Sequence, residues 1–475
     1  MRRKGPRVKS LWRIGVITVG VVVLSSCFTT RNQRFVEIDE AASQGDFDTA
    51  ATQVDSQRDE LYSNRDQVLY FLDSGMLNFY NRNYQRSIQQ FHEAERLIEE
   101  YFTRSISQTA ATFLINDNAQ DYSGEDFEDI YLNVFKAVGF LQQEDFESAF
   151  VEVRRINTKL NLLEDKYQGL AAQYSETEDA SVEFEAGESR FYNSALARYL
   201  SMIMYRADGN YDSARIDWEE IQEAFAQQSN LYSFPLPLDD SVIERTTDAR
   251  LSVLAFTGEA PIKRAETLYV VTFDDRVEIV YAGEGDQGTL VPEGYAGFYY
   301  PGVEGGYRFK FQLPRMVLRG SEVARIRVVV DGEPVGELDM LESMEQIALD
   351  TFQVREPLIF LKTVTRTIVK GIAAQKGKEQ MRAAGAESGS LLGVAAGLIG
   401  SVATDVAVDA SEQADLRVSR FFPAYAHVGE WTVNPGSRTV EIEYYGTDGL
   451  IRVENVGQVN LRSGELNFVT SFHND

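Results

Sequence analysis

The sequence of 475 residues has one cysteine, Cys27, and three widely separated histidines, His92, His427 and His473. A single cysteine excludes an internal disulfide, so the fold must be stabilised by its packed core. It also excludes a cysteine-rich zinc site, and the histidines form no His-Glu-x-x-His motif. The Gly-x-Ser-x-Gly motif of serine hydrolases is absent as well. The sequence therefore predicts no metal, no cofactor and no catalytic residue.

Two further patterns carry little catalytic information. Residues 371–379 contain two glycines, but their spacing differs from that of a phosphate-binding loop, and Glu379 stands where Ser or Thr would bind magnesium. The acidic pairs at 239–240 and 274–275 resemble carboxylate dyads. Pairs of this kind arise by chance among 73 acidic residues. We therefore expect that the protein is not an enzyme.

Acidic residues outnumber basic residues by 73 to 46. Six of the basic residues lie within the first 26 positions, so the rest of the chain has 40 basic residues against the same 73 acidic ones. A field of this sign repels the phosphates of nucleic acid and of anionic lipids. The composition therefore predicts no nucleic-acid partner.

The first 26 residues combine a basic start with a short apolar run. Six basic residues, without an acidic one, precede the apolar stretch 14–24. These eleven residues are few for a membrane span, which needs about 20, whereas they suit a cleaved export signal. We therefore expect residues 1–26 to be a signal peptide. An uncleaved membrane anchor is the alternative.

The apolar run ends in a pattern that resembles the lipobox of bacterial lipoproteins, formed by Leu24, Ser25, Ser26 and Cys27. This resemblance implies that Cys27 carries diacylglyceryl and acyl groups and is followed by a tether over 27–35. Several acyl chains anchor a protein stably, because each buried methylene contributes roughly 0.8 kcal/mol. Phe28 follows Cys27, and by the sorting rules of Gram-negative lipoproteins its presence favours the outer membrane, facing the periplasm. An ordinary signal peptide with a chance cysteine is the alternative.

Residues 36–232 have a helical composition. The segment is rich in Ala, Glu, Gln, Leu and Arg, has apolar residues at helical spacing and contains no proline. One phrase recurs in it, as GDFDTA at 45–50, RNYQRS at 82–87, EDFESA at 144–149 and GNYDSA at 209–214. Each phrase has an aromatic residue, then a small residue three positions later, and precedes an amphipathic run. A recurring unit of this kind indicates a repeat architecture.

The phrase resembles the tetratricopeptide repeat, in which a tight turn joins two antiparallel helices. The resemblance implies that the aromatic residue opens the second helix and fills the groove between the pair, while the small residue allows close packing. These roles fall on Phe47 and Ala50, Tyr84 and Ser87, Phe146 and Ala149, and Tyr211 and Ala214. An all-α solenoid of this type binds proteins or peptides in its concave face.

The repeat is irregular. The phrase aromatics are 37, 62 and 65 residues apart, whereas tetratricopeptide repeats recur every 34 residues. Divergent helix pairs with insertions near 103–128 and 170–188 would explain this spacing. A helical domain without true repeats would explain it equally, and both interpretations stay open.

The pattern changes after residue 232. Two prolines in SFPLPLDD bar a continued helix, and we expect a linker over 233–250. From 251 to 475, short β-branched and aromatic runs alternate with turn residues, which predicts a β-sandwich-like domain. Asp331 and Gly332 between two such runs predict a hairpin turn.

A helical, glycine-rich insertion is expected within this domain at 341–410, with a kink or break at Pro357. Residues 391–404 in it are apolar or small and uncharged, and 14 residues are short for a membrane span. We favour a buried core or a contact with a partner or a second copy, with membrane insertion and disorder as alternatives. The candidate contact residues are Leu391, Leu392, Gly393, Gly397, Leu398 and Gly400.

The whole layout resembles a poorly characterised group of Gram-negative lipoproteins with a tetratricopeptide-like N-terminal half. In that group an apolar, glycine-rich segment precedes the phrase Glu-Gln-Ala-Asp-x-Arg, present here as Glu412, Gln413, Ala414, Asp415 and Arg417. The resemblance implies work in the cell envelope, by analogy alongside lipoproteins that activate peptidoglycan synthases. The expected fold is α+β and multidomain, with an all-α solenoid followed by the β-sandwich-like domain and its insertion.

The signal, the repeated phrase and the missing catalytic motifs favour a non-catalytic scaffold for protein–protein interactions. It would serve the assembly or maintenance of the cell envelope, with envelope proteins as partners and the lipid on Cys27 as its hold on the membrane. Two alternatives stay open. One is an envelope glycan-processing enzyme that uses carboxylates in the β-rich half, and the other is an oligomeric export or pore component that uses 391–404 in the bilayer.

Overall fold

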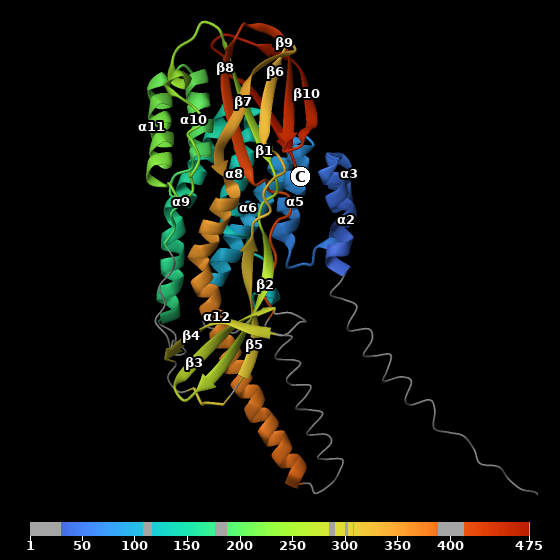
Figure 1. The fold of residues 1–475 in the computed structure, drawn as a ribbon, viewed down its shortest axis with the longest axis vertical. Coiled ribbons are helices and arrows are strands. Elements are labelled where there is room, and N and C mark those ends of the chain that lie inside the picture. The colour runs from blue at the N-terminus through green and yellow to red at the C-terminus, as the bar shows by residue number, and fades with distance from the viewer. Residues whose placement is uncertain are drawn as a thin grey trace, which may run out of the picture.

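The structure is a computed structural model that describes residues 30–107, 116–175, 188–284, 290–299, 303–306, 308–387 and 413–474. Helices and strands both occupy large parts of these ranges, which confirms that the chain mixes α and β structure (Figure 1). Cys27 with its lipobox, and the apolar segment 391–404, lie outside the described residues. Within the described part of the chain, we find no helix that is both long and apolar enough to span a bilayer.

Helix hairpins make up most of the N-terminal half (Figure 1). In each hairpin a tight turn joins a first helix to a second one. The described pairs are α2 (Thr30–Ser43) with α3 (Phe47–Ser56), α5 (Gln67–Tyr80) with α6 (Tyr84–Ser107), α8 (Asp126–Leu141) with α9 (Phe146–Ser175), and α10 (Ala195–Ala207) with α11 (Tyr211–Gln227). Short elements connect or follow them, namely α4 (Arg58–Leu61), η1 (Asp117–Ala119) and η2 (Asp240–Ile243).

The recurring phrase forms the turn of each of these hairpins. Its first residue has a left-handed backbone, with φ of 78° at Gly45, 58° at Arg82, 61° at Glu144 and 75° at Gly209. This conformation ends the first helix. The next residue, an Asp or Asn, caps the second helix by accepting a hydrogen bond from the backbone N–H three residues on. The phrase aromatic is then the first residue of the second helix.

The small and the aromatic residues of the phrases differ in their surroundings. The small residues are buried inside the helical half, with at most 1% of their surface exposed: Ala50, Ser87, Ala149 and Ala214. Among the aromatics, Phe47 is buried and Tyr84 and Tyr211 are half-buried, whereas Phe146 exposes 36% of its surface. The phrase therefore fixes the turn at every hairpin but not the burial of its aromatic ring.

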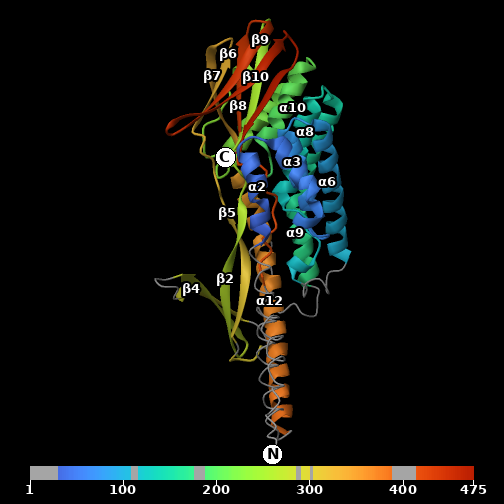
Figure 2. The same cartoon turned by 90° about the vertical axis from the view of Figure 1, so that its right-hand side faces the viewer.

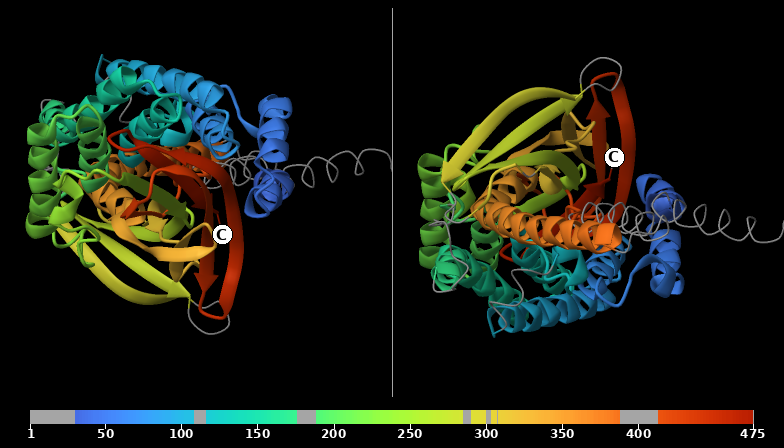
Figure 3. Two further views of the ribbon diagram at one scale, coloured as in Figure 1. Left: turned by 90° about the horizontal axis from the view of Figure 1, so that it is seen from above. Right: turned by 90° about the horizontal axis from the view of Figure 1, so that it is seen from below.

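A seven-stranded sheet occupies the C-terminal half, in the order β10-β9-β6-β7-β8-β1-β11. Neighbours are antiparallel except β1 and β11, which are parallel. The sheet curls until β10 and β11 approach each other, so it is largely closed (Figure 3). Its strands are β1 (Ala249–Thr257), β6 (Arg325–Val330), β7 (Glu333–Ser343), β8 (Tyr425–Val433), β9 (Gly436–Gly446), β10 (Gly449–Leu461) and β11 (Asn467–His473).

The hairpin predicted at Asp331 and Gly332 is confirmed. These two residues connect β6 to β7, and the flanking Val330 and Glu333 pair with each other. Both turn residues have positive φ, 53° at Asp331 and 82° at Gly332. A two-residue turn of this kind matches the right-handed twist of the strands that it joins.

The chain between β1 and β6 forms a separate four-stranded sheet, in the order β4-β3-β2-β5. Helix α12 (Met344–Glu387) lies beside β2 and β5 (Figure 2), and its Val364 joins Leu268 and Phe311 in one small core. Pro357 lies inside α12, which continues past it, so a break at this residue does not occur. The strands are β2 (Ile262–Phe273), β3 (Arg276–Glu284), β4 (Leu290–Tyr299) and β5 (Arg308–Val317).

The two sheets do not form the sandwich that the sequence predicts. The curled sheet has its own inner core, which contains Leu251 and Val253 of β1 and Ile442 of β9. The four-stranded sheet packs instead against α12, in a separate core. Alternating apolar residues show that one face of a strand is buried, but they do not show which element covers it. Here the larger sheet covers its inner face by curling.

The outer face of the curled sheet packs against the helices in one continuous core. The ring centroids of Phe135 on α8 and Phe256 on β1 are 5.0 Å apart, and those of Tyr80 on α5 and Phe472 on β11 are 4.9 Å apart. The first helices α5, α8 and α10 are almost wholly buried as a result. The face of the hairpins on which the sequence predicts a partner is therefore occupied by the chain's own C-terminal half.

A buried carboxylate joins the end of β7 to the helices. Glu342 is fully buried and accepts hydrogen bonds from the hydroxyls of Tyr131 at 2.8 Å, Tyr232 at 2.7 Å and Ser194 at 3.0 Å. The backbone N–H of Leu196 donates to it as well, at 3.1 Å. Burial raises the pKa of Glu342 above its ordinary value, and these donors partly counter the rise. The residue fixes α8 and α10 against the sheet.

We expect the substitution Glu342→Ala to lower the free energy of unfolding by more than about 3 kcal/mol, because several buried donors would lose their acceptor. Glu333→Ala, at an exposed position of the same strand, is the matched control and should cost less than about 0.5 kcal/mol. Urea unfolding followed by circular dichroism measures both. Equal costs for the two variants would contradict the role assigned to Glu342.

Candidate functional site

Residues 413–424, here called the connecting segment, carry the described part of the Glu-Gln-Ala-Asp-x-Arg phrase to the start of β8. Arg417 is buried and donates to the carboxylate of Asp415 at 2.7 Å. It also donates to the backbone carbonyls of Asp117 at 2.7 Å and Gln120 at 3.0 Å. Glu412 lies outside the described residues. The described part of the phrase thus acts as a contact between the helical half and the connecting segment.

Two buried carboxylates of the first helices hold the same segment. Asp73 on α5 accepts from the hydroxyl of Ser419 at 2.7 Å and from the backbone N–H of Arg420 at 2.9 Å. Glu128 on α8 accepts from the backbone N–H of Ser419 at 2.5 Å. Burial, together with the charge of Glu125, raises the pKa of Glu128 to about 7. Glu128 is fully buried, so its near-neutral pKa reflects packing between the two halves and not a solvent-accessible acid.

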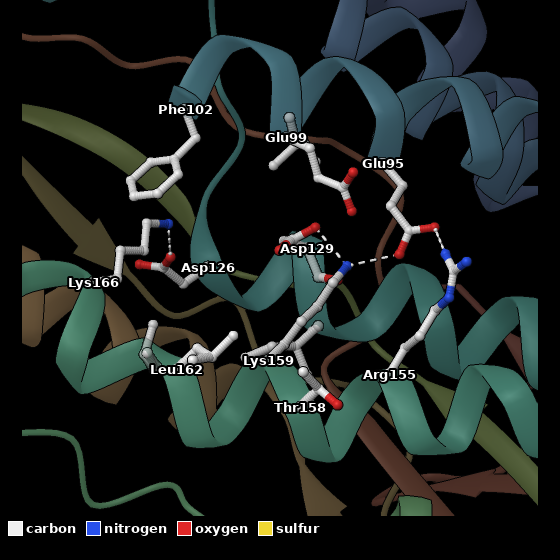
Figure 4. Close-up of a pocket in the computed structure, with 13 residues that line it drawn as sticks. Glu95, Glu99, Phe102, Asp126, Asp129, Arg155, Thr158, Lys159, Leu162 and Lys166 are labelled. Carbon is white, nitrogen blue, oxygen red and sulfur yellow. Dashed lines mark hydrogen bonds and ion pairs between the residues drawn. The ribbon is translucent and has the colours of Figure 1, made fainter. Parts of the chain in front are cut away.

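An open cleft with a volume of about 340 Å³ lies between α6, α8 and α9 (Figure 4). Helix α9 supplies Arg155, Lys159, Leu162 and Lys166. Successive members of this set are three or four residues apart, which places them on one face of the helix. Acidic residues of α6 and α8 form the opposite wall. The hollow combines charged and apolar side chains from three helices, and we treat it as the candidate binding site.

Ion pairs line the polar side of the cleft. Lys159 contacts Glu95 at 2.9 Å and Asp129 at 2.7 Å, and Arg155 contacts Glu95 at 2.7 Å. Figure 4 shows these side chains meeting across the cleft from all three helices. Deeper in the bundle, Lys136 is fully buried and lies 2.8 Å from Glu95. The network holds the three helices at fixed separations and leaves its outer members accessible.

The ion pairs fix the protonation states of the cleft. Burial alone would raise the pKa of Glu95, but Lys159 and Lys136 outweigh it and hold that pKa well below its usual range. Burial alone would lower the pKa of Lys159, yet Asp129 and Glu95 raise it above its ordinary value. Efficient general acid–base catalysis needs a pKa near the working pH. These two groups are therefore suited to binding and not to proton transfer.

The remaining wall of the cleft is apolar. Leu162 exposes 55% of its surface, and Phe102 lies beneath the ammonium group of Lys166, 4.7 Å from the ring centroid. Glu99 is exposed and extends toward the cleft with no ion pair to the residues drawn in Figure 4. An apolar wall beside a carboxylate suits a ligand group that is partly apolar and partly cationic, such as a lysine or arginine side chain.

His427 and the acidic pair at 239–240 lie outside the cleft. His427 has Nε2 3.0 Å from the hydroxyl of Thr257, and burial lowers its pKa to about 4. Asp239 caps η2, and Asp240 accepts from the indole N–H of Trp218 at 2.9 Å. Each of these side chains has a structural contact. In the described part of the chain, no group of three or more histidine, cysteine, aspartate or glutamate side chains could hold a metal ion.

Comparisons with protein families, with curated proteins and with solved structures found no match to this chain. Of the phrase residues singled out in the sequence, none lines the cleft between α6, α8 and α9. The spacing of the basic residues on α9 was the only signal for the cleft in the sequence, because its acidic partners lie on two other helices.

We expect the buried and the exposed cations of the network to contribute very differently to stability. Lys136→Met would leave the buried Glu152 without its ion pair and would remove one of the cations around Glu95, each carboxylate being 2.8 Å from the ammonium group. The cost should be about 3–5 kcal/mol. Arg155→Met removes a side chain that is 46% exposed, and should cost less than about 1 kcal/mol. Thermal and urea unfolding of both variants checks this. Similar losses for the two would contradict the network as described.

The raised pKa of Glu128 predicts a pH dependence of stability. Its folded-state pKa of about 7 lies above the ordinary value of 4.5, so the folded state holds a proton that the unfolded state has released between these pH values. The contribution of Glu128 is therefore full below pH 4.5 and declines by roughly 3 kcal/mol as the pH rises to 7.

Unfolding free energies measured across this pH range test the assignment. Glu128→Gln, which cannot ionise, should flatten the decline relative to the wild type. Asp331→Asn, at an exposed position of the β6–β7 turn, is the control and should leave the slope in this range unchanged. An unaltered slope in Glu128→Gln would assign the titration to other groups.

Proposed function

We propose that the protein is a non-catalytic scaffold of the bacterial envelope. Diacylglyceryl and acyl groups on Cys27 hold it at the outer membrane, facing the periplasm, after removal of residues 1–26. Its helical half, a divergent tetratricopeptide-like solenoid, binds an envelope protein. The β-rich half is available for a second partner. The protein serves in the assembly or maintenance of the envelope.

The chemistry of the cleft between α6, α8 and α9 is the observation that carries this proposal. Glu95 and Lys159 are held ionised by their partners, and Leu162 of the apolar wall remains exposed. A surface of this kind favours recognition over turnover. The extensive buried contacts between the two halves support the same role, because a rigid body fixes the relative position of anything bound at its separate surfaces.

The proposal moves the binding surface away from the position expected for such solenoids. The inner face of the hairpins is covered by β1, β11 and the connecting segment, so a partner has no access to it in this conformation. The cleft opens instead between the second helices α6 and α9, with the start of α8 as its floor. A partner segment would contact Glu99, Phe102 and Leu162 there.

Pull-down from solubilised envelopes tests the scaffold role. The full chain, acylated and crosslinked in intact cells, should retain a specific protein partner. Leu162→Glu should weaken its recovery at least fivefold, since it places a charge in the apolar wall. Ile216→Glu on α11, at a side chain that is likewise about half exposed, is the matched control and should not. Recovery of no specific protein, or equal recovery with both variants, would overturn the proposal.

The membrane anchor is tested separately. We expect Cys27→Ala to abolish incorporation of labelled palmitate and to release the protein from the membrane fraction. The physical reason is that the acyl chains supply the anchoring free energy. Fractionation and mass spectrometry of the amino terminus measure both effects. A Cys27→Ala protein that remains membrane-bound after signal cleavage would show that another segment holds it.

A further inference from the structure

A second hollow, of about 720 Å³, lies where the α8–α9 turn meets the end of α10 and the β10–β11 turn. We call it the aromatic groove, because Phe146, Phe150 and Phe468 contribute rings to its lining. These rings are only partly buried, and Phe150 packs on Tyr205 with 4.7 Å between centroids. The groove is separate from the cleft between α6, α8 and α9, with which it shares no lining residue.

Phe146 differs from the aromatics of the other three phrases. Phe47 packs on Tyr80 with 5.0 Å between ring centroids, and Tyr84 packs on Phe79 at 5.5 Å. Tyr211 is covered by a guanidinium group, that of Arg245, 4.2 Å from its ring centroid. Phe146 has no ring or cation contact with any residue that the structure describes, and it remains 36% exposed. The other phrase aromatics are covered either by another aromatic ring or, at the equivalent position of the next hairpin, by the guanidinium group of Arg245.

The rim of the aromatic groove is acidic. Glu144, Glu147 and Asp208 are exposed around it. Glu465 is exposed as well, and it pairs with Arg462, the basic residue of the lining. The excess of negative charge over an aromatic floor selects a cationic side chain and disfavours an acidic one.

We propose that the aromatic groove is a docking site for an arginine-bearing, partly apolar segment of an envelope protein. The arginine stacks on Phe146, as Arg245 does on Tyr211, and the carboxylates of Glu144 and Glu147 neutralise it. The apolar part of the segment contacts Phe150 and Phe468. This inference rests on the proposed scaffold function and supplies the chemistry of one partner, at a surface other than the cleft.

A peptide of alternating leucine and arginine, labelled with a fluorophore, is the probe. Its binding to the purified full chain is followed by fluorescence anisotropy. We expect saturable binding that is lost when the arginines are replaced by citrulline, which keeps the shape and removes the charge. Phe146→Ala should weaken it about fivefold or more, the effect of losing a cation–π contact. The double variant Glu144→Gln, Glu147→Gln should weaken it as well.

Val151→Ala is the matched control, because Val151 is exposed on the same helix and lines neither hollow. It should bind the peptide like the wild type. Circular dichroism confirms that each variant is folded, which the exposure of Phe146 favours. Peptide binding that is insensitive to Phe146→Ala, or equal for the citrulline peptide, overturns the assignment.

A second copy of this chain is the other occupant that the groove could hold. Analytical ultracentrifugation of the wild type and of Phe146→Ala tests for it by measuring self-association. A self-associated wild type that Phe146→Ala converts to a monomer overturns the partner segment in favour of a homotypic interface. The outcome for the scaffold function is read independently, from the pull-down with Leu162→Glu. If the wild type does not bind the peptide, the groove assignment is rejected, and the proposed role of the cleft is unaffected.

Discussion

The fold depends on carboxylates that are buried at the contact between the helical half and the rest of the chain. Asp73 and Glu128 accept hydrogen bonds from the connecting segment, and Glu342 accepts hydrogen bonds from α8 and α10. Glu430 of β8 forms an ion pair with Arg206 of α10, with 2.7 Å between the carboxylate oxygen and the guanidinium nitrogen. Burying such groups costs free energy unless each acceptor finds a partner. Each of these four carboxylates has at least one partner in the opposite half, so the halves depend on each other for part of their polar contacts.

This dependence explains why the molecule is better regarded as one packed body than as a solenoid attached to a β domain. The aromatic residues of α5 and α8 share one core with β1 and β11. The segment at 233–250, interpreted from the sequence as a linker, carries η2, and its Val242 is buried. Among the described residues, the two hollows considered above lie at helices and turns.

Local features of the fold were predictable from the sequence, because their causes are local. An Asp or Asn before the phrase aromatic is a helix cap, and Asp331 with Gly332 is a favoured hairpin turn. Arg82 and Glu144 also have a left-handed backbone, but their residue types do not predict it. The turns there are recognised only by comparison with the phrases that begin with Gly45 and Gly209.

Features that depend on distant pairing were not predictable. Ser419 meets Asp73 across 346 positions of sequence, and no periodicity records such a contact. The candidate cleft is hidden for the same reason, because Lys159 and Glu95 are 64 positions apart and each alone resembles an ordinary surface charge. The curl of the larger sheet was not predictable either. Alternating apolar residues indicate that one face of a strand is buried, but they do not indicate which element covers that face.

Two segments leave the curled sheet and return to it: residues 260–319, which contain the four-stranded sheet, and residues 344–424, which contain α12. The way they are joined to the sheet bears on how the chain can change in evolution. Glu259 pairs with Gly320, and Ser343 pairs with Tyr425, so each segment leaves and returns at the same place. The entropy of closing a loop rises only slowly with its length. Insertions or deletions between these paired ends, outside the connecting segment, would therefore disturb the curled sheet little. The four-stranded sheet and α12 are the parts in which relatives can differ most in length while keeping the same central body.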